Sequence, residues 1–272
     1  MFTLQYFERS PRVTLLQILL KDEYSLKIDG IFGPKTLAAL KAFQQSRGKF
    51  PSGNATPDTW NDLLLGTGLV VVSSVDMGDP TLETDVQALK AAGDRPIELG
   101  GMCNGLEALI DAVRGRAAGK SIAALRLDGH GNLGRWLTVS VGDVVDLTKA
   151  EYAIIAKEYY SYVDAEHFST VAPLLGQLSN QFASFGFAEH HGCSLGKRPE
   201  TRKMLAKLAN LWDVPISVGI TLQNVGAVTY FNGPVFTAFP RGMNLHTWSH
   251  QFQNSSVRNA TYVSNSSPLF FR

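Results

Sequence analysis

Short apolar runs alternate with amphipathic helical segments from residue 69 onward, and this alternation constrains the fold more than any other feature of the chain. The runs LVVVSSV, SIAALRLDGHG, QFASFGFAEHHGC and PISVGI are typical of strands that are buried on both faces. The segments TLETDVQALKAAG, NGLEALIDAVRGRAAG and 199–212 predict helices between them. Strands that alternate with crossover helices predict an α/β domain with a mostly parallel sheet. A final hairpin that turns at Asn232-Gly233 is predicted from VTYFNGPVFTAFPRG.

Residues 1–66 show helical periodicity alone. Gly33-Pro34 and Thr56-Pro57 each place a proline at the first position of a helix, where its missing N–H costs nothing. Earlier in the chain, Val13, Leu16 and Leu20 fall on one helical face. Together these signals predict three short helices. A short linker, GTG, follows the last of these helices. We therefore predict a helical module at residues 1–66 and an α/β domain at residues 69–272 with an irregular C-terminal tail.

Composition and charge exclude several classes of protein. The 272 residues carry a formal net charge of +1 with no basic patch, which argues against a nucleic-acid partner. No apolar run approaches the roughly 20 residues that a membrane span requires. The N-terminus lacks the basic segment, apolar stretch and cleavage site of a signal peptide, so we predict a chain that is cytoplasmic as made.

The N-terminal motif LQ…L…Y…DGIFGPKT…AL…FQ…TW…L resembles the PGBD-like peptidoglycan-binding domain over residues 10 to 66. The resemblance implies a small helical module that binds the bacterial cell wall or a related glycan. We expect most of its signature residues to lie in the core and in turns. These residues are Asp29, Gly30, Phe32, Gly33, Phe43, Gln44 and Trp60.

A histidine and a cysteine follow two of the predicted central strands. Chemistry in open α/β sheets collects at the carboxyl ends of the strands. His130 and Cys193 fall at two such ends, in that order and about sixty residues apart, which is close to the spacing in caspase-like cysteine peptidases. The pattern predicts Cys193 as a nucleophile and His130 as its general base.

Residues 69 to 226 also resemble the caspase-like domain of unknown function near the N-termini of large bacterial surface adhesins. The motifs LVVVSSVD, NGLEALIDAV, DGHGNLG, HGCSLG and LAKLANLWDVPISVGITLQNVG carry the resemblance. It implies a caspase-like α/β fold. At the cysteine the chain reads His-His-Gly-Cys-Ser where caspases have Gln-Ala-Cys-x-Gly, so the substrate pocket is unassigned.

The residues around the predicted pair have secondary roles in this hypothesis. A developing oxyanion needs hydrogen-bond donors, and the N–H groups of Gly131 and of Cys193, which follows Gly192, are suited to supply them. Asp128 is expected to orient His130 or to set specificity, and His191 is expected to lie beside the site. The substrate would be a peptide or protein, and we predict no cofactor.

Two other constellations use the same residue types. Cys103 at the start of a helix, with His130 or His167, would match papain-like cell-wall endopeptidases, which have an antiparallel sheet after that helix. A metal site at His190, His191 and Cys193, with or without His130, is disfavoured because adjacent residues of a strand point to opposite faces. We predict no metal.

Together these features predict a cell-wall-targeted cysteine peptidase. Because no signal peptide is predicted, the chain would reach the wall or periplasm through a specialised secretion apparatus, as an antibacterial effector does, or by lysis. A competing hypothesis is a non-catalytic wall-binding or docking protein whose caspase-like scaffold is inert.

Overall fold

A computed structural model describes residues 2–77, 80–99, 105–130, 135–138, 162–226 and 228–257. The helices are α1 (Pro11–Tyr24), α2 (Pro34–Ser46), α3 (Pro57–Leu64), α4 (Glu83–Ala91), α5 (Gly105–Ala117), α7 (Phe168–Leu175), α8 (Pro199–Trp212) and α9 (Leu245–His250). The strands are β1 (Leu69–Asp76), β2 (Ile97–Leu99), β3 (Ser121–Asp128), β4 (Arg135–Thr138), β5 (Tyr162–Asp164), β6 (Phe182–His190), β7 (Ile216–Gly219) and β8 (Val235–Ala238).

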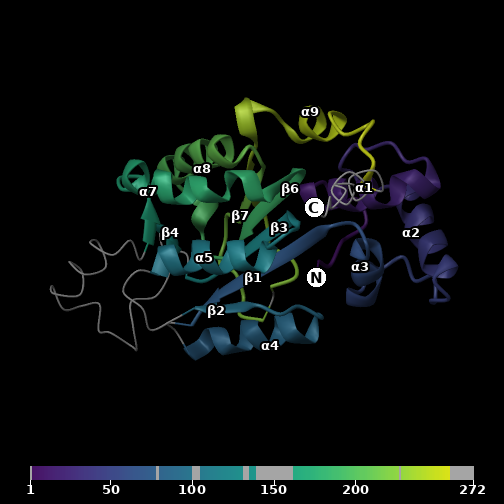
Figure 1. Cartoon of the computed structure of the whole chain (residues 1–272), viewed down its shortest axis with the longest axis horizontal. Coiled ribbons are helices and arrows are strands. Elements are labelled where there is room, and N and C mark those ends of the chain that lie inside the picture. The colour runs from purple at the N-terminus through teal and green to yellow at the C-terminus, as the bar shows by residue number, and fades with distance from the viewer. Residues whose placement is uncertain are drawn as a thin grey trace, which may run out of the picture.

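The centre of the molecule is a twisted sheet with the strand order β2-β1-β3-β6-β7-β8 (Figure 1). Every neighbouring pair in it is parallel except β7 and β8. Strands β4 and β5 form a separate antiparallel pair. The predicted helical region followed by an α/β domain with a mostly parallel sheet is therefore confirmed.

The predicted hairpin at Asn232-Gly233 is wrong. Residues 228–234 form turns, and a single strand, β8, pairs antiparallel with β7 instead. The turn chemistry was recognised correctly, since Gly233 has a φ of 84°. The carbonyl of Asn232 accepts hydrogen bonds from Thr221 and Gln223, so the turn is fixed to the loop after β7 rather than to a preceding strand.

Each face of the sheet has its own apolar core. Helices α5, α7 and α8 cover one face, where residues such as Ile110 and Leu208 pack with Leu127. The N-terminal helices cover the other face, and Trp60 belongs to one buried cluster with Phe187. Helix α4 packs against Val75 of β1 in a smaller cluster. The helical module and the sheet therefore share a core.

The start of each N-terminal helix follows from its capping sequence. The Ser10 hydroxyl accepts from the N–H of Val13 at the start of α1, and Thr56 accepts from Thr59 at the start of α3. Prolines occupy the first position of all three helices. In Figure 1 these purple and blue helices lie together on the side of the sheet away from α5 and α7.

Part of the C-terminal segment, which we predicted to be irregular, is the short helix α9. Asn244 and Thr247 form a capping box that begins this helix. Trp248 and Phe252 then pack against Ile18 of α1 in a small buried cluster. Residues 258–272 lie outside the described residues.

Candidate functional site

A small cavity of about 60 Å³ lies at the carboxyl ends of β3 and β6. Its lining includes Asp128, Gly129 and His130 from the end of β3. His191 and Cys193 line it from the end of β6. The parallel pairing of β3 with β6 brings these two ends together, since Leu127 is in register with His190.

Cys193 is a half-buried thiol in the turn that follows β6. The backbone N–H of Gln223 lies 3.4 Å from its Sγ, and the carbonyl oxygen of Gln223 lies 3.7 Å from it. The loop after β7 therefore holds the sulfur in place. Gly192, directly before it, is buried.

His130 lies two residues beyond the end of β3 and is exposed to solvent. It reaches the same cavity as Cys193 from the neighbouring strand. The structure thus brings together the two residues that the sequence pairs as base and nucleophile. Gly131, the predicted oxyanion residue on this side, lies outside the described residues.

Two buried carboxyl groups form one wall of the cavity. Asp128, the last residue of β3, and Asp85, in the first turn of α4, are each 3% exposed. They hydrogen-bond to one another, and the N–H of Gly226 donates to Asp85. Burial and the negative charge of Asp85 raise the pKa of Asp128 well above its ordinary value, which favours its protonated form. The sequence signal for Asp85 was a polar residue on the inner side of an amphipathic helix.

His191 lies beside the thiol with its ring almost fully buried. Its Nε2 is 3.3 Å from a carboxylate oxygen of Glu189, and its ring stacks on Phe231 with centroids 4.3 Å apart. Burial lowers the pKa of His191 to about 4, so the ring is neutral at neutral pH. The Glu189 carboxylate, the nearer partner, only accepts hydrogen bonds, so Nε2 carries the ring proton and Nδ1 is an acceptor. The approach of Arg12 to Nε2 is then a contact without a hydrogen bond.

A buried ion pair behind the cavity links α1 to β6. Both Nε and Nη2 of Arg12 donate to the Glu189 carboxylate, the latter over 2.8 Å. Arg12 also donates to the Thr229 carbonyl and lies 3.4 Å from His191. Burial alone would raise the pKa of Glu189, but Arg12 and His191 hold it below its ordinary value. Sequence reasoning missed this pair, although a charged residue inside an apolar strand was a signal for it.

The two alternative constellations receive no support. Among the described residues, no group of three or more His, Cys, Asp and Glu side chains has a geometry that could hold a metal ion. Cys103 lies outside the described residues. His167 lies 2.9 Å from Asp164 near β5, and the mostly parallel sheet differs from the antiparallel sheet that a papain-like enzyme requires.

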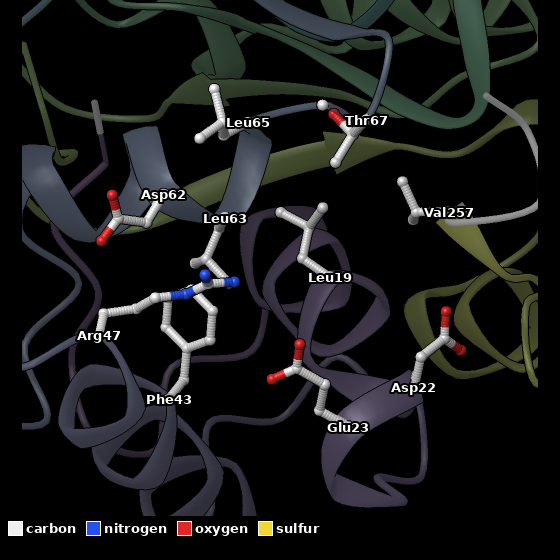
Figure 2. A pocket seen from close by; sticks show the side chains of 11 residues that line it. Leu19, Asp22, Glu23, Phe43, Arg47, Asp62, Leu63, Leu65, Thr67 and Val257 are labelled. Carbon is white, nitrogen blue, oxygen red and sulfur yellow. The ribbon is translucent and has the colours of Figure 1, made fainter.

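A second pocket, of about 260 Å³, lies between the N-terminal helices (Figure 2). Helix α1 contributes Asp22 and Glu23, and Asp62 comes from α3. The guanidinium carbon of Arg47 lies 5.1 Å from the centre of the Phe43 ring. Figure 2 shows the Arg47 side chain laid across that ring, with its charged end toward the pocket. The pocket therefore carries both signs of charge beside an apolar floor.

The signature residues of the helical module mostly build its fold. Gln44 accepts from the N–H of Gly53 over 2.9 Å, and Trp60 donates to the Phe2 carbonyl over 2.9 Å. Gly30 has a φ of 71°, and a Cβ there would lie 2.9 Å from a methyl group of Leu245. Of the seven signature residues, Phe43 lines the pocket of Figure 2. The remaining signature residues also stabilise the fold. Phe32 is buried, Gly33 directly precedes α2, and the Asp29 carboxylate accepts a hydrogen bond from Gln17 over 2.8 Å.

Comparison with known proteins assigns the helical region. Residues 9–63 match the family described as putative peptidoglycan binding domain. No curated protein and no solved structure matches the chain. Over the described part of the chain, the helices are too short or too polar for any of them to cross a bilayer. A cell-wall glycan is therefore the partner that the N-terminal helices indicate.

Proposed function

We propose that this protein is a cysteine peptidase with a caspase-like fold that acts at the bacterial cell wall. The observation that carries the proposal is that His130 and Cys193 line one cavity from the ends of adjacent parallel strands. The family match of residues 9–63 supports the association with the wall. The strand order and the mostly parallel sheet are compatible with a caspase-like domain.

In the first half of the reaction, the His130 imidazole takes the proton of the Cys193 thiol. The thiolate attacks the carbonyl carbon of the peptide bond, and the electron pair of the C=O bond moves to oxygen. The N–H groups of Cys193 and Gly131 are proposed to stabilise this oxyanion. When the tetrahedral intermediate collapses, the C–N bond breaks and the leaving amine takes the proton from His130. A thioester on Cys193 remains.

In the second half, water hydrolyses the thioester. His130 takes a proton from the water as its oxygen attacks the carbonyl carbon. Collapse of the second intermediate breaks the C–S bond, releases a carboxylic acid and returns the proton to the sulfur. The Gln223 N–H donates to the Cys193 sulfur, and because this bond does not need the thiol proton it also suits the thiolate.

Wall binding is assigned to the pocket of Figure 2. Peptidoglycan carries carboxylates and, in its peptides, amino groups. Arg47 is positioned to pair with a carboxylate, and Asp22 with an amine. Asp62, on the other side of the pocket, already pairs with Lys49 over 2.7 Å. Delivery to the wall by a specialised secretion apparatus or by lysis stays part of this proposal.

Labelling with a peptidyl electrophile tests the chemistry. On the full-length chain we expect the probe to modify Cys193. We expect no labelling of Cys193→Ala and a rate at least about 100-fold lower in His130→Ala, because a general base contributes that much or more. Cys103→Ala is the matched control and should label normally.

Two results would contradict the proposal. Labelling that survives Cys193→Ala and disappears in Cys103→Ala would transfer the nucleophile to the papain-like alternative. Absence of labelling and of peptide cleavage under all conditions would favour an inert scaffold, the docking protein considered above.

A further inference from the structure

The cavity beside Cys193 is rich in hydrogen-bond acceptors. Asp85, Asp128 and His191 all line it. Within the part of the chain that the structure describes, Oδ2 of Asp128 and Nδ1 of His191 are buried and have no hydrogen-bond partner. A buried acceptor without a donor is costly, so these atoms indicate a ligand that donates hydrogen bonds.

The His191 ring gives the second, independent indication of a donor ligand. Its Nε2 donates to Glu189 over 3.3 Å, and the Arg12 guanidinium, which can only donate, approaches the same nitrogen to 3.4 Å without a hydrogen bond. The remaining ring nitrogen, Nδ1, is therefore a buried acceptor on a residue that lines the cavity. The stack on Phe231 holds the ring in this orientation.

The charge of the cavity wall favours a cation. Asp85 and Asp128 are both buried carboxyl groups on this wall. The negative charge of Asp85 raises the pKa of Asp128, and the buried Arg126 opposes this shift only in part, so the wall carries the charge of Asp85. That charge is buried, where its attraction for a cation is stronger than in water. The carboxylate of Asp85 is fixed by the Gly226 N–H and cannot turn away.

The size and the apolar walls restrict the cation to the end of a side chain. A volume of about 60 Å³ holds roughly two water molecules, which is close to the size of an ammonium or guanidinium head. Leu82, Val225 and Val228 supply apolar lining. A chain of methylene groups that leads to a charged head would pack against such residues.

We propose that this cavity binds the basic side chain, lysine or arginine, of the substrate residue whose carbonyl Cys193 attacks. This inference rests on the proposed function and specifies its substrate class. Asp85 pairs with the cation, while Oδ2 of Asp128 and Nδ1 of His191 accept its remaining N–H groups. The specificity is then for peptides cleaved after a basic residue.

Peptidyl electrophiles that differ in one side chain test the inference on the full-length protein. Arginine, lysine, norleucine or glutamate occupies the position next to the reactive carbonyl. We expect the arginine or lysine probe to label Cys193 about 100-fold faster than norleucine, since a site built for hydrogen bonds rejects ligands that lack them. Asp85→Asn should reduce that preference to below about tenfold. Glu83→Gln, on the exposed side of the same helical turn, should leave it unchanged.

Binding measured without chemistry separates this inference from the proposed function. Calorimetry on Cys193→Ala with an arginine-containing peptide should show binding that Asp85→Asn abolishes. This result supports the cavity as a basic subsite even if no probe labels Cys193. Equal labelling by norleucine and arginine overturns the subsite and leaves the catalytic pair standing. If the probes show no preference for a basic side chain and the peptide does not bind, the basic subsite is overturned as well.

Discussion

At the scale of single residues, two neighbouring histidines have different surroundings. His190 ends β6 and is fully buried, whereas His191 lines the cavity. Burial lowers the pKa of His190 to about 3 and that of His191 to about 4. Both rings are therefore neutral in the folded protein at neutral pH, and protonating either one opposes folding.

These lowered pKa values predict a loss of stability in mild acid. Below about pH 6.5 the unfolded chain binds protons that the folded chain does not, so the free energy of unfolding falls as the pH falls toward 4. Each histidine contributes about 1.4 kcal/mol per pH unit to this slope. Asp128, whose pKa is raised, acts in the opposite direction and offsets part of it. Urea unfolding between about pH 7 and about pH 5 measures the slope.

A substitution tests whether His190 causes this pH dependence of the free energy of unfolding. His190→Asn should reduce the pH dependence by about 1.4 kcal/mol per pH unit, whatever its effect on stability at neutral pH. His246→Asn is the matched control, because His246 is exposed on α9. An unchanged slope in His190→Asn would show that this ring is not responsible.

At the scale of elements, charged residues in the central strands fix the position of α1 on the sheet. Arg126 of β3 and Glu189 of β6 are in register on adjacent strands, inside otherwise apolar runs. Arg12 of α1 then pairs with Glu189, and the guanidinium carbons of Arg12 and Arg126 lie 5.2 Å and 4.7 Å from the centre of the Phe2 ring. The helix is therefore fixed to the sheet by charge as well as by apolar contacts.

Removing one partner of this pair should be strongly destabilising. Arg12→Met leaves the Glu189 carboxylate buried beside an apolar side chain, and we expect a loss of about 3–5 kcal/mol in the free energy of unfolding. The double substitution Arg12→Met with Glu189→Met should recover most of that loss, because no unpaired charge remains. Arg9→Met, at an exposed arginine just before α1, is the control for urea denaturation. A loss no larger than in Arg9→Met would contradict the role of the pair.

Helices and strands could be predicted from the sequence where a local pattern, such as apolar periodicity or a capping residue, determines them. Helix α8 and strand β1 follow directly from their apolar periodicity, and α3 follows from its capping residues. The partner of β8 could not be predicted, because it depends on a loop that is near only in the folded chain. The same holds for the Arg12–Glu189 pair, whose members are 177 positions apart. At the candidate site, His130 and Cys193 could be paired from strand ends, but Asp85 and Gln223 could not.

At the scale of the whole molecule, α1 connects the two candidate sites. Its first turn holds Arg12, behind the cavity of Cys193, and its last turn lines the pocket of Figure 2 with Asp22 and Glu23. Glu23 follows Arg12 by eleven positions along the helix, a distance of about 16 Å along the axis. Wall contact and chemistry would therefore occur on one rigid element, with a fixed spacing between a bound glycan and the peptide that is cleaved.

Because the helices and the sheet share a core, wall binding is best measured on the full-length chain. We expect the Cys193→Ala protein, which cannot cleave, to sediment with purified sacculi at low salt. Adding Arg47→Ala should weaken this binding about tenfold or more, the usual effect of losing a charge-assisted hydrogen bond. Arg114→Ala is the matched control, since Arg114 is an exposed arginine of α5, on the other face of the sheet. Equal loss in both variants would indicate a general charge effect rather than the pocket. A protein that stays in the supernatant at low salt would remove the wall from the proposed function.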